Sequence, residues 1–110
     1  MPGAIARPKF AKIAASASGN NELVAAVPGM RIRVLAYNLM AAEVVAAKFR
    51  SNGGGEGAAD ISGLKYLAAN GGIAPGLSEV GWFETEAGES LDLNLSGAVA
   101  VGGELVYIEV

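Results

Sequence analysis

The chain has 110 residues and a formal net charge of −3, and it contains neither cysteine nor histidine. This length supports one compact domain that buries only about 60–65% of the surface exposed by its unfolded chain. The missing cysteine excludes disulfides and thiolate sites, and the missing histidine removes the commonest general base and metal ligand. Most hydrolase mechanisms are therefore excluded, and we expect a protein that is not an enzyme and that uses no cofactor or metal.

Small and apolar residues are unusually frequent. Alanine, valine, isoleucine, leucine, methionine, phenylalanine, tryptophan and glycine together make up about 64% of the chain, whereas an ordinary domain has roughly 45–50%. A domain of this size has too little interior to hold all of them, and contiguous apolar patches on a surface usually mark protein contacts. Self-association is the simplest interpretation. The alternative is that alanine, with 21 copies, is mainly a filler.

The charges are segregated along the chain. Residues 1–50 carry seven basic and two acidic side chains, whereas residues 51–110 carry one basic and nine acidic side chains. Two regions of opposite sign would suit the association of identical copies. The basic residues are scattered singly, so we expect no nucleic-acid partner. No stretch approaches the roughly 20 apolar residues that cross a bilayer, and no secretory signal is visible, so we expect a soluble protein made in the cytoplasm, without a membrane partner.

Residues 1–9 contain two prolines and predict an extended N-terminal arm. Turn residues at Gly19-Asn20-Asn21 and Pro28-Gly29 then separate the first strands. The strands expected in the first half are Phe10–Ser18, Glu22–Val27, Arg31–Met40 and Glu43–Ser51.

The third of these strands changes its apolar parity, because Ile32 and Val34 lie on one side while Leu35 and Tyr37 lie on the other. This change predicts a β-bulge near Val34-Leu35. A hairpin through Ala41-Ala42 should join the third strand to the fourth.

The second half begins with a glycine-rich loop over Asn52–Gly57, and Ile61–Ala68 is ambiguous between a short strand and irregular structure. The alternation of Leu91, Leu93 and Leu95 with Asp92 and Asn94 predicts a strand with its leucines inward and its polar residues in solvent. Turns should lie at Ala87-Gly88 and at Gly102-Gly103, which would close a terminal hairpin. The strands expected in this half are Val80–Thr85, Leu91–Leu95, Ala98–Val101 and Glu104–Val110.

About eight short strands at regular spacing predict an all-β fold, a single-domain antiparallel β-sandwich or jelly roll over residues 10–110, with a closed barrel as the rival. The run from Leu105 to Ile108 is apolar on both parities, so we expect the opposing sheet to cover one face and a neighbouring molecule the other. The arm offers charge and apolar anchors to a partner surface. The residues expected at an interface are Arg7, Lys9, Phe10, Leu105 and Tyr107.

Three further patterns have both a functional and a structural interpretation. Gly53-x-Gly55-x-x-Ala58 matches a dinucleotide fingerprint, but Ser62-Gly63 breaks the helix that the fingerprint requires, so a flexible hairpin loop is the better interpretation. The aromatic residues Trp82-Phe83 and Tyr66 could stack against a sugar, although a tryptophan in a sandwich more often packs in the core.

The third pattern is an acidic cluster. Its carboxylates could bind a divalent cation or act as an acid–base pair on a glycoside, but their spacing matches no known loop and a solvated acidic turn is the default. The cluster consists of Glu84, Glu86, Glu89 and Asp92.

The chain from about Ala15 to Val110 resembles the small β-rich structural proteins of tailed-bacteriophage virions. The resemblance rests on Leu23–Val34, Gly81–Thr85, Gly88–Leu95 and Val101–Leu105. It implies a head decoration, or cement, protein that clamps neighbouring subunits of the major capsid protein, often as a homotrimer, in a virion assembled in the host cytoplasm. A tail or fibre component is equally compatible with the resemblance. A small carbohydrate- or surface-binding module is the alternative from a different class. An exposed pair of aromatic rings would favour this module, whereas a Trp82 buried in the sandwich would favour the virion protein.

Overall fold

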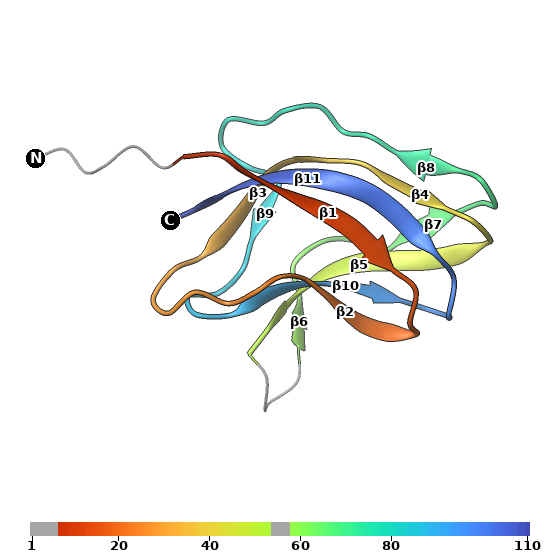
Figure 1. The fold of residues 1–110 in the computed structure, drawn as a ribbon, viewed down its shortest axis with the longest axis horizontal. Helices are drawn as coiled ribbons and strands as arrows, with labels where there is room; N and C mark the ends of the chain where they lie inside the picture. The colour runs from red at the N-terminus through yellow and green to blue at the C-terminus, as the bar shows by residue number, and fades with distance from the viewer. Residues whose placement is uncertain (1–6, 54–57) are drawn as a thin grey trace, which may run out of the picture.

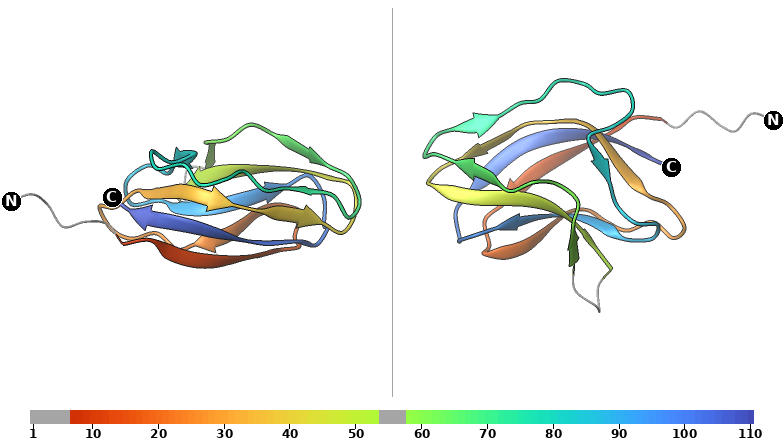
Figure 2. Two further views of the ribbon diagram at one scale, coloured as in Figure 1. Left: turned by 90° about the horizontal axis from the view of Figure 1, so that it is seen from above. Right: turned by 180° about the vertical axis from the view of Figure 1, so that it is seen from behind.

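The structure is a computed structural model that describes residues 7–53 and 58–110. These residues form eleven β-strands and no helix, so the described part of the chain offers no helix that could cross a membrane. The strands form two antiparallel sheets packed together as a β-sandwich, which confirms the predicted fold class (Figures 1 and 2). The strands outnumber the predicted eight because several pairings involve only two or three residues.

Sheet A is built around the longest strand, β11. β1 pairs with one edge of β11, while β4 and then β3 pair with its other edge, and β8 and β9 extend the sheet beyond them (Figure 1). β1 is therefore an outer strand of this sheet. The strands of sheet A are β1 (Lys9–Ala15), β3 (Ile32–Tyr37), β4 (Leu39–Ala41), β8 (Gly72–Ile73), β9 (Phe83–Glu84) and β11 (Val101–Glu109).

Sheet B has the strand order β2-β10-β5-β6, and β7 also pairs with β5. Its central pair, β10 and β5, runs antiparallel over six residue pairs from Ser90↔Asn52 to Leu95↔Ala47. The strands of sheet B are β2 (Gly19–Val24), β5 (Val45–Asn52), β6 (Ala58–Asp60), β7 (Lys65–Leu67) and β10 (Ser90–Leu95).

The hydrophobic core lies between the two sheets. Leu91, Leu93 and Leu95 are at most 1% exposed, as their alternation predicted. Phe49 from sheet B contacts Tyr37 and Phe83 from sheet A, with ring centroids 4.9 Å and 4.6 Å apart. Such edge-on and tilted pairs add to the apolar burial that holds the sheets together.

The predicted β-bulge is confirmed. Val106 of β11 pairs with Ala36, and the next residue, Tyr107, pairs with Val34, which leaves Leu35 as the extra residue in β3. Because of this extra residue, Val34 and Leu35 are both buried although they are adjacent. The turns at Pro28-Gly29 and Ala87-Gly88 also form where predicted.

Both predicted hairpins are wrong. The chain at Ala41-Ala42 crosses between sheets, since β4 pairs within sheet A and β5 pairs within sheet B. Gly102-Gly103 does not close a turn, because β11 runs through it without interruption. Gly103 instead allows close approach to a neighbouring strand, since a Cβ atom there would lie 2.0 Å from the carbonyl oxygen of Asn38.

Two local predictions also need correction. Gly19-Asn20-Asn21 begins β2 and is not a turn, because the Asn21 amide donates to the Leu93 carbonyl oxygen at 3.2 Å and fixes the strand against β10. Asp92 is 2% exposed and not in solvent, since Asn52 Nδ2 and Ser90 Oγ both donate to its carboxylate.

The ambiguous segment, the arm and the glycine-rich loop have separate outcomes. Ile61–Ala68 contains the short strand β7. Lys9, predicted as the last residue of the arm, belongs to β1 and pairs with Tyr107. Residues 1–6 of the arm and residues 54–57 of the glycine-rich loop lie outside the described residues. Ala58 begins strand β6 where the dinucleotide fingerprint would need a helix.

Candidate interaction surface

The outer faces of the two sheets differ in chemistry. The outer face of sheet B is polar over β5 and β6, where Lys48 Nζ and Arg50 Nε lie 3.1 Å and 2.8 Å from the carboxylate oxygens of Asp60. Tyr66 of β7 is an exposed ring on the same face. On the same face Asn94 Nδ2 donates to Asn20 Oδ1 at 2.7 Å. These polar side chains bond to one another across neighbouring strands, and polar groups of this kind are stable in contact with water, so they need no protein partner.

The outer face of sheet A is mostly apolar. Its outward positions on β1, β3, β4 and β11 carry mainly small or hydrophobic side chains, with Arg33, Lys12 and Glu104 as charged exceptions, and we call this surface the apolar face. Phe10 and Met40 are 81% and 62% exposed there, and Leu77 at its rim is 69% exposed. The residues of the apolar face are Phe10, Ala14, Ala36, Met40, Gly102 and Val106.

Shallow grooves mark the apolar face. One groove, of about 750 Å³, runs along Ala14, Ala42 and Gly102, where the side chains are too small to fill the surface, and Met40 borders it. A second, of about 460 Å³, lies between Phe10 and the segment 74–77. Protruding apolar side chains next to unfilled grooves are typical of surfaces that bind another protein.

Asn38 borders both grooves and ties β3 to β11 at the point where β11 changes partners. Its backbone N–H donates to the Glu104 carbonyl oxygen at 3.0 Å, and its Nδ2 donates to Glu104 Oε1 at 3.1 Å. Glu104 and Lys12 are the charged cross-strand pair on this part of the face. Lys12 makes no ion pair with any residue that the structure describes.

The five residues predicted for an interface have different positions. Phe10 lies on the apolar face, and Arg7 and Lys9 are exposed close to it in sequence, with Lys9 Nζ 3.0 Å from Glu109 Oε1. Leu105 was predicted wrongly, because it points into the core and is only 1% exposed. Tyr107 is half-buried against the core, since it has the same parity as the buried Val101 and Leu105 in the uninterrupted strand β11.

The sequence analysis missed the groove residues Ala14, Met40 and Gly102. One signal could have indicated Gly102, because a glycine inside a strand often marks a place where another backbone comes close. The alanines carry no comparable signal, since alanine occurs throughout the chain.

The segment 74–82 forms a fixed rim beside β3. Backbone N–H groups of Ser78 and Trp82 donate to the carbonyl oxygens of Leu35 and Val34, each at 2.8 Å. The Trp82 indole N–H donates to the Gly76 carbonyl oxygen at 2.8 Å. Trp82 is 48% exposed, contrary to the expected core position, and Phe83 takes that position instead.

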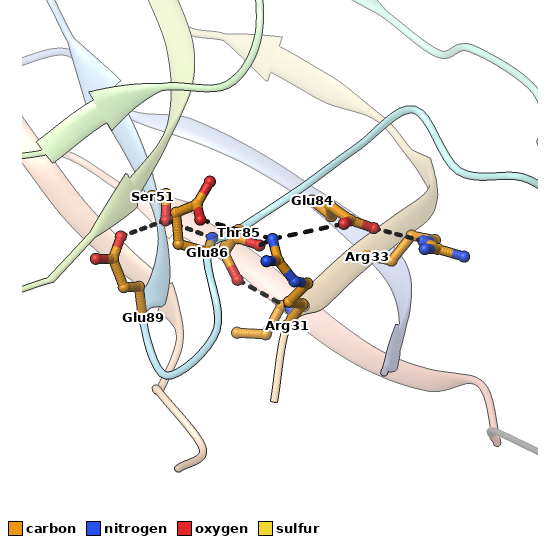
Figure 3. Close-up of polar contacts among 8 residues, drawn as sticks. Arg31, Arg33, Ser51, Glu84, Thr85, Glu86 and Glu89 are labelled. Carbon is orange, nitrogen blue, oxygen red and sulfur yellow. Dashed lines mark hydrogen bonds and ion pairs between the residues drawn. The ribbon is translucent and has the colours of Figure 1, made fainter. Parts of the chain in front are cut away.

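The acidic cluster predicted around residues 84–92 does not converge on one point (Figure 3). Glu84 Oε1 lies 2.7 Å from Arg33 Nε, and Arg31 NH1 lies 3.8 Å from Glu84 and 3.7 Å from Glu86. Glu89 accepts a hydrogen bond from Ser51 Oγ at 2.6 Å. Each carboxylate therefore has its own partner, and the described residues contain no acidic group arranged to hold a metal ion.

Two buried hydroxyls at this end of the sandwich hold the chain that follows β9: that of Thr85 bonds within sheet A, and that of Ser51 joins sheet B to sheet A. Thr85 Oγ1 accepts from the Ile32 N–H at 2.9 Å, and Ser51 Oγ accepts from the Glu86 N–H at 2.9 Å (Figure 3). Ser51 is only 1% exposed, so its bond to Glu89 is out of reach of a substrate. The geometry serves to join β5 to the chain after β9, and it lacks the access that a nucleophile needs.

Two side chains have shifted ionisation. Burial raises the pKa of the Tyr37 hydroxyl above its ordinary value. Burial also lowers the pKa of the Lys65 ammonium group, which donates to the Gly63 carbonyl oxygen at 3.1 Å. Both shifts arise from desolvation of the charged form, and neither residue belongs to the acidic cluster.

Comparisons of the chain with protein-family profiles, with curated proteins and with solved structures found no match.

Proposed function

We propose that this protein is a non-enzymatic structural component of a virion, in the first instance a head decoration protein. It would act by packing its apolar face against subunits of the major capsid protein and against copies of itself. The observation that supports this proposal is the contrast between the two sheets: the outer face of sheet B carries paired polar groups beside the exposed ring of Tyr66, and the other outer face leaves Phe10, Met40 and Leu77 exposed over unfilled grooves.

The size of the exposed set explains why a partner is needed. An apolar side chain moved from water to a protein contact contributes about 1.5–3 kcal/mol, and a small monomer seldom leaves several large side chains together on one face. The virion setting is supported by the resemblance of Leu23–Val34 and Gly81–Thr85 to small phage structural proteins. Sedimentation of the purified protein would distinguish the homotrimer that the resemblance implies from a dimer.

Replacing Phe10 tests the proposal. We expect Phe10→Ser to leave the melting temperature nearly unchanged, because the side chain is 81% exposed, and to lower the amount of protein found by mass spectrometry in purified particles of the phage that encodes it. Tyr66→Ser is the matched control, since Tyr66 is 82% exposed but lies on sheet B, and its particles should contain the normal amount. Particles that never contain the wild-type protein would contradict the virion proposal.

A carbohydrate- or surface-binding module is the second candidate, because Trp82 is half-exposed beside the exposed Val80. Among the described residues, however, Trp82 has no aromatic neighbour with which to form a stacking pair. Trp82 is the only tryptophan of the chain, so its fluorescence reports on this position alone. A saturable change of that fluorescence on titration with a glycan would favour this candidate over the first.

A further inference from the structure

Gly102 is a glycine that the fold itself does not require. It lies inside the nine-residue strand β11 and faces outward into the groove of about 750 Å³. A Cβ atom placed there would find its nearest neighbour, the Ile13 carbonyl oxygen, at an ordinary 3.8 Å. Glycine weakens a strand interior, and where the local structure would accept a side chain, its presence points to close approach by something outside the chain.

The outward residues of β1 and β11 form three cross-strand pairs. They are Phe10↔Val106, Lys12↔Glu104 and Ala14↔Gly102, in order along the two paired strands (Figure 1). The first pair is large and apolar, the second carries one positive and one negative charge, and the third is the smallest possible. Each pair is matched in kind, so it is complementary to the same pair with its two members exchanged.

We infer that the apolar face binds the same face of a second copy of this chain, around a two-fold axis that runs between β1 and β11 in the plane of contact. This axis exchanges the members of each pair: Phe10 packs over Val106 of the other copy, and Ala14 lies over Gly102. Lys12 of each copy then meets Glu104 of the other. The inference rests on the proposed docking role of the apolar face and identifies its partner as a second copy.

Charge and area both favour this occupant. Two copies bring two Lys12–Glu104 contacts of opposite sign, whereas a face with one charge sign would repel its own copy. A standard protein contact covers about 800 Å² on each partner, which is roughly one seventh of the 5939 Å² of exposed surface. A stable dimer would therefore have to bury about that area across the apolar face.

Charge exchange tests the pairing directly. We expect the wild-type protein to sediment as a dimer at micromolar concentration, and Lys12→Glu and Glu104→Lys to associate roughly tenfold or more weakly, since each homodimer would contain two like-charge contacts. An equimolar mixture of the two variants should recover the dimer, because both contacts in the mixed pair are again of opposite sign. Thermal melts of each variant confirm that it is folded.

Gly102→Leu provides a second test that does not depend on charge. The added side chain fills the groove, so the variant should stay folded and lose the dimer. Gly63→Leu is the matched control, since a Cβ there likewise has room, with nothing within 4 Å, but the residue lies in the connection between β6 and β7 of sheet B.

The outcomes separate this inference from the proposed function. A wild-type monomer at every concentration, a mixture that stays monomeric, or a Gly102→Leu variant that still dimerises would overturn the two-fold contact. A trimer in the same sedimentation experiment would also overturn it, because this face then pairs with a different surface. A dimer that forms as expected while purified particles lack the protein would uphold the contact and contradict the virion role.

Discussion

At the residue scale, Tyr37 shows how one side chain links the core to pH. Its ring contacts those of Phe49 and Phe83, with centroids 4.9 Å and 5.7 Å away, and it is 6% exposed. Burial raises the pKa of its hydroxyl above the ordinary value of 10.0. The folded protein therefore holds the Tyr37 proton more tightly than the unfolded chain does.

This difference predicts a loss of stability in alkali. The contribution of Tyr37 is fully present below pH 10.0 and is lost as the pH rises through the higher pKa of the folded state, because the unfolded chain releases the proton first. Tyr37→Phe keeps the ring contacts and has no proton to lose. We expect urea unfolding between pH 9 and about 11.5 to show a smaller decline for Tyr37→Phe than for the wild type. Equal declines would contradict the role of Tyr37.

Single residues also show why parts of the sequence analysis failed. Alternation in β10 correctly placed Leu93 inside, but it could not tell that Asp92 on the other side would be covered by Asn52 and Ser90. Alternation assigns a side chain to one face of a strand, and it does not say whether that face meets water. The same limit applies to Leu105, whose run is apolar on both parities.

At the element scale, the sequence predicted the β-bulge in β3 correctly and the hairpin between β4 and β5 wrongly. The bulge at Leu35 could be predicted, because a change of parity within one strand is written in consecutive residues. The hairpin through Ala41-Ala42 could not be corrected from sequence, since the choice between pairing in sheet A and crossing to sheet B depends on partners more than 25 residues away, such as β8 and β11. Gly102-Gly103 also resembles a turn in sequence, because only the long-range pairing of β11 with β1 shows that the strand continues through these two glycines.

These two neighbouring glycines should respond oppositely to alanine. Gly103 has a φ of 152°, and an added Cβ would lie 2.0 Å from the Asn38 carbonyl oxygen, so Gly103→Ala should lose at least about 1–3 kcal/mol of unfolding free energy. Gly102 has room for a Cβ, so Gly102→Ala should gain roughly 0.4–1 kcal/mol by restricting the unfolded chain. Denaturant unfolding at low protein concentration measures both. A destabilised Gly102→Ala would show that the fold needs this glycine after all.

At the scale of the whole molecule, the composition predicted that some apolar surface would stay exposed after folding, but it could not locate that surface on the fold. The excess of small and apolar residues predicted an exposed patch, and Phe10, which was expected at an interface, is exposed on it. Its other members come from β1, β3, β4 and β11, which are separated by up to about 90 residues in the sequence and meet only through the sheet order. The polar outer face of sheet B became visible only once the strands of that sheet were known.

Truncation separates the arm from the sandwich. The sequence placed the boundary after residue 9, whereas β1 already begins at Lys9 and supplies Ile13 and Ala15, which are 1% and 2% exposed, to the core. We expect a chain that begins at residue 7 to melt at nearly the temperature of the full chain, because it keeps β1 complete. A chain that begins at residue 16 should fail to fold: it loses the pairing with β11 and buried groups worth at least about 2–5 kcal/mol, out of a total stability of roughly 5–15 kcal/mol.

Circular dichroism melts of the two truncated chains measure the difference. A cooperative melt from the chain that begins at residue 16 would show that β1 is dispensable, and the apolar face would then lose its central cross-strand pairs without loss of the fold. A lowered melting temperature for the chain that begins at residue 7 would show that the arm contributes to the sandwich. The predicted docking role of the arm requires a third combination: unchanged melting with reduced incorporation into particles, because ordering an extended segment costs about 1–2 kcal/mol per residue and only a partner surface can offset that cost.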